Sequence, residues 1–186
     1  MIHYVKGDIT KSDCDIICHQ VNCQGAMNSG VAKAIREKWP EVYDNYKRWC
    51  DREEYKEDLL GHYQTIQIND NPQKWIVNLF TQQYYGYNGI RYTDYEAFYS
   101  SISHLAIEFS NVPNKTIAFP YKIGCVRGGA NWNIIRTMIE EVFEDRDIYF
   151  YYLNDEDLDR KAKDYISVQQ YLKEFREEYL NEQENN

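Results

Sequence analysis

Two glycine-bearing stretches have the residue types that bind a phosphate through the backbone. They are VNCQGAMNSGVAKAI (21–35) and AFPYKIGCVRGGANW (118–132). Each follows an apolar run and leads into a segment of helical periodicity, which predicts a strand, a loop and a helix. Backbone N–H groups at a helix start bind anions without any side-chain charge, and glycine allows a close approach. One such loop is most simply a tight turn, whereas two in one domain favour a clamp around a diphosphate.

The sequence lacks the familiar motifs for nucleotide binding, for a histidine base and for metal binding. Neither loop has the Gly-Lys-Ser/Thr of a P-loop or the GxGxxG of a dinucleotide fold. None of the four histidines is well placed to act as a base, and His19 is expected to face the core from its strand. No His, Asp or Glu cluster has ligand spacing, so we expect no metal and no other cofactor.

The loops must be positioned by a sheet with helices on it. Strands are predicted at 2–7, 15–22, 62–68, 75–80, 115–120 and 147–153, and helices at 31–38, 95–109, 134–142 and 165–179. The first helix should stop before Pro40. Several strands are apolar without alternation, as in strands buried on both faces. Strands alternating with helices predict an α/β sheet layered between helices, with ligands outside the carboxyl ends of the strands.

Composition narrows the class of protein. The 186 residues carry a net charge of −9, with 30 acidic and 21 basic residues, and no basic stripe, so bulk nucleic acid is an unexpected partner. The five cysteines are scattered, which argues against disulfides and structural zinc. Cys14 and Cys18 are interpreted as small core residues. With no membrane-length apolar run and no secretory leader, we expect a reduced, cytoplasmic protein.

Three stretches together resemble the macrodomain, the ADP-ribose-binding module: YVKGDIT (4–10), VNCQGAMNSGVAKAI and IAFPYKIGCVRGGANW (117–132). The resemblance covers residues 1–153 and implies a three-layer α-β-α fold with a mixed central sheet. It is strongest to the branch of ADP-ribose-1″-phosphate phosphatases, terminal ADP-ribose hydrolases and antitoxins that reverse DNA ADP-ribosylation. Residues 154–186 lie outside it. We expect an amphipathic helix and an acidic tail there, which pack on the domain or offer a partner surface.

The resemblance assigns roles in the first half of the chain. Asp8, with Ile9 beside it, would receive the adenine amino group; otherwise Asp8 is a turn or cap residue. Asn22 would contact the distal ribose, and Gly30 and Val31 would offer backbone N–H groups. Asn28 and the neighbouring Ser29 either touch the anomeric end of the ribose or cap the helix.

The second loop would surround the pyrophosphate. Its implied ligand-binding residues are Gly124, Cys125, Val126, Arg127, Gly128 and Gly129. Arg127 either adds charge or points into solvent, and Cys125 fits a small loop residue better than a nucleophile. Trp132 is interpreted as an anchor for the next helix. In the tyrosine-rich segment 78–95, Arg91 and Tyr92 could recognise an extra phosphate, or the segment is a surface loop ending in a Thr93 helix cap.

The resemblance leaves both an enzyme and a binding module open. Some hydrolases of this branch use an aspartate in the second loop with a lysine, and the aspartate is absent here, which argues against a covalent lysine intermediate. Antitoxin-type relatives have a lysine near the position of Gln82 or Gln83. What remains is substrate-assisted hydrolysis, with Asn22 and Asn28 fixing the ribose. We therefore expect a hydrolase of ADP-ribose-1″-phosphate or of an ADP-ribosyl conjugate; the alternative is a non-catalytic binder or sponge.

Overall fold

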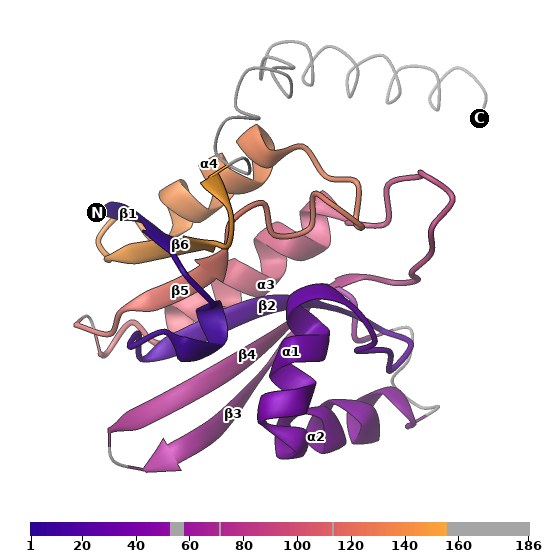
Figure 1. The fold of residues 1–186 in the computed structure, drawn as a ribbon, viewed down its shortest axis with the longest axis horizontal. Helices are drawn as coiled ribbons and strands as arrows, with labels where there is room; N and C mark the ends of the chain where they lie inside the picture. The colour runs from indigo at the N-terminus through magenta and orange to yellow at the C-terminus, as the bar shows by residue number, and fades with distance from the viewer. Residues whose placement is uncertain (53–57, 71, 113, 156–186) are drawn as a thin grey trace.

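A computed structural model describes residues 1–52, 58–70, 72–112 and 114–155 (Figure 1). Its sheet has six strands in the order β1-β6-β5-β2-β4-β3. All neighbouring strands are parallel except β3 and β4. The strands are β1 (Ile2–Lys6), β2 (Ile16–Asn22), β3 (Tyr63–Asp70), β4 (Gln73–Gln82), β5 (Ile117–Pro120) and β6 (Ile148–Tyr152). The helices are η1 (Ile9–Lys11), α1 (Gly30–Lys38), α2 (Pro40–Cys50), α3 (Tyr95–Glu108) and α4 (Trp132–Val142).

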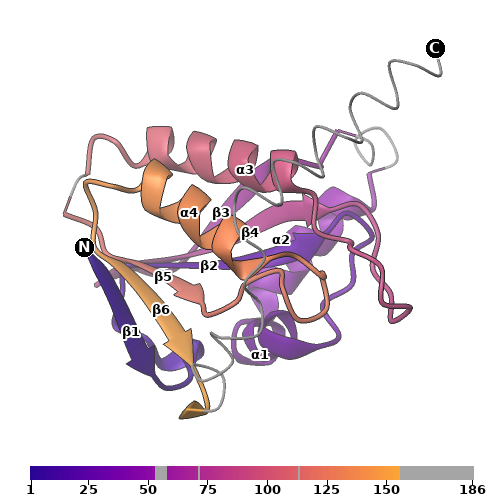
Figure 2. The ribbon, with the colours of Figure 1, turned by 90° about the horizontal axis from the view of Figure 1, so that it is seen from above.

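Helices cover both faces of the sheet. Figure 2 shows α3 and α4 on one side of the strands and α1 and α2 on the other. The core under α3 and α4 contains Phe98, Ile135 and Phe119. The core on the opposite face contains Ile17 and Ile35. The expected three-layer α-β-α fold with a mixed sheet is therefore confirmed, and every residue of β5 is buried, as its unbroken apolar sequence indicates.

One helix was not predicted from the sequence. Pro40 was interpreted only as a stop for α1, which does end at Lys38. The same proline occupies the first turn of α2, where its missing N–H costs nothing because that N–H has no partner inside the helix. Val42, Tyr46 and Cys50 are spaced by four residues and are all buried under α2.

The connections reverse direction between β2 and β5, which are neighbours in the sheet. After β2 the chain passes through α1 and α2 toward β3 and β4, whereas after β5 it passes through α4 toward β6. The two glycine loops leave the carboxyl ends of these parallel strands on opposite faces (Figure 1). A crevice forms at such a switch point, where ligands bind in open α/β sheets.

The predicted carboxyl-terminal helix at 165–179 lies outside the described residues. Among the helices of the described ranges, none combines the length and the apolar character needed to cross a membrane.

Candidate ligand-binding site

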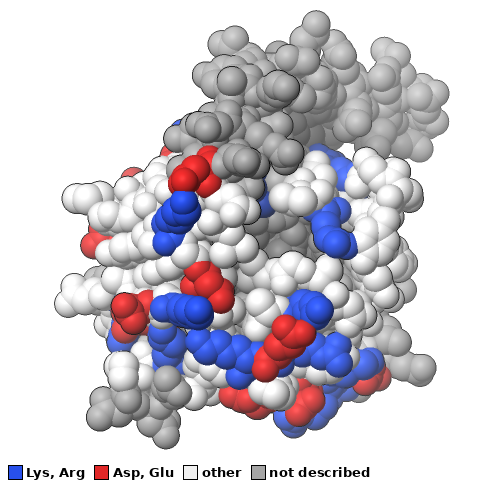
Figure 3. Space-filling model, viewed as in Figure 1, with Lys and Arg blue, Asp and Glu red and all other residues white. Residues whose placement is uncertain are grey.

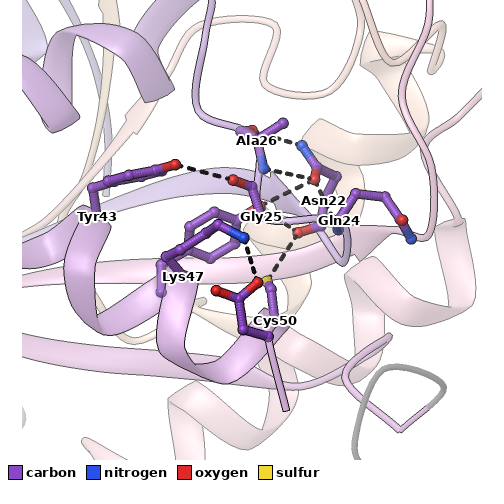
Figure 4. Close-up of polar contacts among 9 residues, drawn as sticks. Asn22, Gln24, Gly25, Ala26, Tyr43, Lys47 and Cys50 are labelled. Carbon is purple, nitrogen blue, oxygen red and sulfur yellow. Dashed lines mark hydrogen bonds and ion pairs between the residues drawn. The ribbon is translucent and has the colours of Figure 1, made fainter. Parts of the chain in front are cut away.

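The first loop is folded around the side chain of Asn22, at the end of β2 (Figure 4). Its Oδ1 accepts hydrogen bonds from the backbone N–H of Gln24 (2.9 Å) and of Ala26 (3.2 Å). Its Nδ2 donates to the Ala26 carbonyl (2.7 Å). From α2, the Tyr46 hydroxyl lies 2.6 Å from the Asn22 carbonyl oxygen and 3.0 Å from Oδ1. Asn22 is thus a scaffold for the loop and keeps one amide hydrogen for another acceptor.

The loop leads into the amino terminus of α1, which carries no side-chain cap. Ser29 is the N-cap residue, but its side chain makes no capping hydrogen bond. The Asn28 Oδ1 accepts from Arg36 of the same helix instead (2.9 Å). Neither side chain therefore makes the capping hydrogen bond to α1 that one interpretation expected. The backbone N–H groups of Gly30 and Val31 belong to the first turn, where an anion finds both donors and the positive end of the helix dipole.

The second loop is shaped by Thr93, a residue that is 1% exposed. The Thr93 hydroxyl accepts from the Gln20 Nε2 (2.9 Å) and donates to the Gly124 carbonyl (2.9 Å). The Gly128 carbonyl accepts from the backbone N–H of Tyr92 (2.8 Å) and of Thr93 (2.9 Å). These contacts attach the tyrosine-rich segment to the second loop.

The prediction that Thr93 caps α3 is wrong. Asp94 is the N-cap residue, and its Oδ1 accepts from the backbone N–H of Ala97 (2.8 Å). Thr93 instead fills the space that two glycines leave. A Cβ on Gly128 would lie 2.1 Å from the Thr93 Oγ1, and one on Gly124 would lie 3.0 Å from the same atom. Close packing requires glycine at both positions, and the positive φ of Gly124 (74°) is a second reason at that position.

Between the two loops lies a cavity of about 370 Å³, a volume in the range of small-molecule sites. The predicted site residues that line it are Asn22, Asn28, Gly30, Val31, Gly124, Val126, Arg127 and Gly128. The described residues around the cavity include Lys122 and Arg127 but no Asp or Glu. In Figure 3, red and blue side chains mix over the lower part of the face, whereas the described atoms around the hollow at the right are white or blue.

Four predicted residues do not line this cavity. Asp8 follows β1 and caps the short η1 helix, with its Oδ1 accepting from the Thr10 N–H (2.9 Å). Ile9 is 5% exposed and packs in the core. Cys125 has its thiol 3.4 Å from the Ile123 carbonyl. Gly129 faces the backbone of the tyrosine-rich segment.

A sequence model of the Macro domain family matches residues 18–139. The match covers more than half of the 186 residues and contains both glycine loops and the cavity between them. The chain belongs to the macro domain family.

Relatives of this macro domain include a glycohydrolase and a phosphatase. A DNA ADP-ribosyl glycohydrolase of Mycobacterium tuberculosis is 26% identical over 145 residues, which are 77% of this chain and 39% of that protein. An ADP-ribose 1″-phosphate phosphatase of Debaryomyces hansenii is 32% identical over 101 residues, covering 46% of this chain and 56% of the relative. The chain therefore spans about half or less of these relatives.

Solved structures agree with the fold. The macrodomain of Mycobacterium tuberculosis DarG superposes with a TM-score of 0.70 at 22% identity, covering 83% of this chain and 99% of that one. Thermosipho africanus DarTG, solved in complex with ADP-ribose, superposes with a TM-score of 0.67 at 20% identity. This match covers 84% of this chain and 44% of that one.

The floor of the macro domain cavity includes His19, which is 1% exposed, as predicted. Its Nε2 lies 2.6 Å from the Asn78 Oδ1. Asn78 Nδ2 donates to the Gln64 Oε1, and Gln64 Nε2 donates to the Asn45 carbonyl. The Asn45 carbonyl can only accept, which fixes the orientation of the Gln64 amide and, through it, that of the Asn78 amide. The Asn78 Oδ1 therefore accepts from His19, and the proton of the neutral imidazole lies on Nε2. Burial lowers the pKa of His19 to about 4, so the ring is uncharged at neutral pH and is a weak base.

The buried thiols of Cys14, Cys18 and Cys23 supply no thiolate to the macro domain site. All five are described and are free thiols. Cys14 and Cys18 are buried, as predicted, and burial raises the pKa of both. Burial also raises the pKa of Cys23 to about 12. Each of these three thiols is therefore protonated at neutral pH.

Several residues of the site were missed. Gln20, Tyr121, Lys122, Tyr85 and Tyr87 line the cavity. The polar residues that interrupt the apolar sequence toward the end of β2 are the signal that could have found Gln20. The role of Trp132 was predicted well, since its ring packs edge-on against Tyr121 and Phe150, each at 5.0 Å between centroids.

Proposed function

We propose that this macro domain binds ADP-ribose in the cavity and hydrolyses ADP-ribose-1″-phosphate or an ADP-ribosyl conjugate. The observation that carries the proposal is the meeting of two glycine loops and a helix amino terminus around one cavity without a carboxylate among the described lining residues. Such a cavity accepts a diphosphate through backbone donors. The named activities of the relatives support the same ligand.

In the proposed pose, ADP-ribose lies along the edge of the sheet formed by the carboxyl ends of the parallel strands. The distal ribose lies against Asn22 and the first loop, and the diphosphate lies between the start of α1 and Gly124–Gly129. The adenine extends toward Asp8 and Ile9, because β1, β6 and β5 are adjacent parallel strands whose carboxyl ends share that edge. Asp8 uses Oδ1 for its cap, and the other carboxylate oxygen is proposed to accept from the adenine amino group.

The proposed chemistry needs no protein nucleophile. Asn22 and Asn28 each retain an amide hydrogen for a ribose hydroxyl, and the ligand's own phosphates help to orient a water. The water oxygen bonds to the anomeric carbon, the bond from that carbon to the conjugate breaks, and the leaving group takes a proton from the water. With ADP-ribose-1″-phosphate, the water oxygen bonds instead to the terminal phosphorus, the bond from that phosphorus to the 1″-oxygen breaks, and the 1″-oxygen takes a proton from the water. Fixed N–H donors stabilise the developing charge.

A non-catalytic binder of ADP-ribose-type nucleotides is the second candidate. The observation that favours it is the composition of the cavity, since the described lining has no carboxylate and its histidine has a pKa of about 4. Among the described residues, the only lysine that lines the cavity is Lys122, and Lys33 on α1 pairs with Glu37 at 3.6 Å. In either case we place the protein in the cytoplasm, and its five free cysteines support a reducing compartment. We also place it in the turnover of nucleotides derived from NAD.

Calorimetry with ADP-ribose tests the ligand. We expect micromolar binding, and we expect Asp8→Ala to weaken it by about 1–3 kcal/mol because the proposed acceptor for the adenine amino group is lost. Asp8→Asn separates the two roles of this residue, since its amide oxygen still caps η1 while its amide hydrogens face the adenine donor. Asp13→Ala, at an exposed carboxylate in the same segment, is the matched control. Absence of binding by the wild type would refute the proposed function.

Turnover separates the two candidates. The protein is incubated with ADP-ribose-1″-phosphate, O-acetyl-ADP-ribose, and ADP-ribosylated DNA and protein. Release of phosphate, acetate or free ADP-ribose supports the hydrolase and names its substrate. Tight binding of ADP-ribose without any of these products supports the binder.

A further inference from the structure

Exposed apolar side chains gather at the mouth of the cavity. Of eleven exposed large hydrophobic residues in the described chain, five lie on the tyrosine-rich segment and the second loop at this mouth. These five form the tyrosine rim: Tyr84, Tyr85, Tyr87, Ile90 and Val126. Three of its members, Tyr85, Tyr87 and Val126, also line the cavity. Clustered apolar exposure beside a pocket indicates a contact site, because isolated exposed residues are the rule elsewhere on a monomer.

The rim is built on a braced loop. The Asn88 Oδ1 accepts from the Ile90 N–H (3.3 Å) and from the Tyr92 hydroxyl (2.8 Å). Gly86 packs against Tyr92 so closely that a Cβ on it would lie 2.1 Å from the Tyr92 hydroxyl. The Tyr92 N–H is bonded to the Gly128 carbonyl of the second loop (2.8 Å). The rim and the second loop therefore form one unit, and a partner that docks on the rim finds rings already positioned.

Two arginines lie beside the uncharged rim, although the protein as a whole is acidic. The Arg127 guanidinium lies over the Tyr87 ring at 4.8 Å, and the Arg91 guanidinium lies over the Tyr95 ring at 4.5 Å. The two segments that form the mouth, 83–93 and 121–132, contain no Asp or Glu although the chain has a net charge of −9. Positive side chains interleaved with flat aromatic rings complement a chain of phosphates and bases.

We propose that the tyrosine rim stacks a nucleobase of a single-stranded nucleic acid that carries the ADP-ribosyl group. Arg91 and Arg127 would then lie against its phosphates. The inference rests on the proposed function, because the ADP-ribosyl group must fill the cavity before the attached strand reaches the rim. Tyrosine and arginine planes accept any base by stacking, whereas a peptide acceptor provides neither the planes nor the phosphates. A paired duplex keeps its bases stacked inside, which agrees with the expectation that bulk nucleic acid does not bind.

The test compares affinities for the ADP-ribosyl group with and without its acceptor. Dissociation constants are measured for ADP-ribose, for a short single-stranded DNA and a matching RNA ADP-ribosylated on a base, and for an ADP-ribosylated peptide. We expect at least one nucleic acid conjugate to bind about tenfold more tightly than ADP-ribose, and the DNA and RNA arms identify which. Tyr87→Ala should bring this ratio close to one, and Tyr87→Phe should keep it because the ring remains.

Tyr99→Ala is the matched control, because Tyr99 is an exposed tyrosine of α3 that lies outside the rim and the cavity lining. The inference is overturned if neither nucleic acid conjugate gains affinity, if the peptide gains as much, or if the gain survives Tyr87→Ala. These outcomes leave ADP-ribose binding intact and so differ from failure of the proposed function, in which ADP-ribose itself does not bind.

Discussion

Thr93→Val removes one hydroxyl from the support of the second loop and keeps the shape of the side chain. The change takes an acceptor from Gln20 Nε2, which then retains only a 3.5 Å contact with the Thr81 carbonyl. It also takes a donor from the Gly124 carbonyl, which retains the Ala130 N–H at 3.1 Å. The half-buried Gln20 amide is therefore left poorly paired, at a cost of about 1–2 kcal/mol.

Because the loop must be ordered to bind a diphosphate, we expect ADP-ribose affinity to fall by about 1–2 kcal/mol, or roughly 5–30-fold. Calorimetry measures the affinity, and urea unfolding of the same samples measures the free energy of unfolding. Thr93→Ser keeps the hydroxyl and should bind within about twofold of the wild type. Gln20→Leu added to Thr93→Val removes the orphaned amide and should recover part of the loss. If Thr93→Val lost stability but bound ADP-ribose as the wild type does, the coupling of Thr93 to the ligand would be refuted.

Three further changes test other parts of the site. Between pH 6.5 and about 4, unfolded chains take up the proton that folded His19 excludes, so the free energy of unfolding should fall by about 3 kcal/mol as the pH drops. Urea unfolding measured at several pH values should show a clearly weaker dependence of this free energy on pH in His19→Gln. The same pH dependence in His19→Gln and the wild type would contradict the assignment. Gly128→Ala places a Cβ 2.1 Å from the Thr93 hydroxyl oxygen and should weaken ADP-ribose binding more than about tenfold by calorimetry, so wild-type affinity would count against the packing argument. Tyr46→Phe removes the hydroxyl that lies 2.6 Å from the Asn22 carbonyl and should lower the free energy of unfolding by about 1–3 kcal/mol, a loss that denaturant curves would reveal.

The sheet was predictable because its strands are short apolar runs separated by turn residues. All six predicted strands are present, and their bounds differ by a few residues. The order β1-β6-β5-β2-β4-β3 could not be derived from periodicity, since it depends on which strands pair. The missed helix α2 shows the limit of a local rule: Pro40 stops one helix and starts the next, and only the buried spacing of Val42, Tyr46 and Cys50 distinguishes the two cases.

The glycine loops were predictable for a different reason, because glycine is placed by local backbone demands. The side chains that hold these loops in place were not predictable. Thr93 bonds to Gln20 across 73 residues of sequence and to Gly124 across 31. Tyr46 reaches Asn22 from a helix that the sequence analysis did not predict. Such contacts depend on the register of the sheet and on the packing of helices, which no residue pattern in one segment contains.

The proposed anion site is compatible with an acidic chain because its donors belong to the backbone. Backbone N–H groups carry no net charge, so the 30 acidic residues elsewhere need no compensation at the site, provided that none of them lines the cavity. The loops must instead be fixed in shape, since a loop rich in glycine is flexible unless other groups hold it. In this macro domain polar side chains hold the loops: the buried Asn22 and Tyr46 hold the first loop, and the buried Thr93 with the half-buried Gln20 holds the second. The affinity of the site therefore depends on side chains such as Tyr46 and Thr93, which do not line the cavity, as much as on the loops that form it.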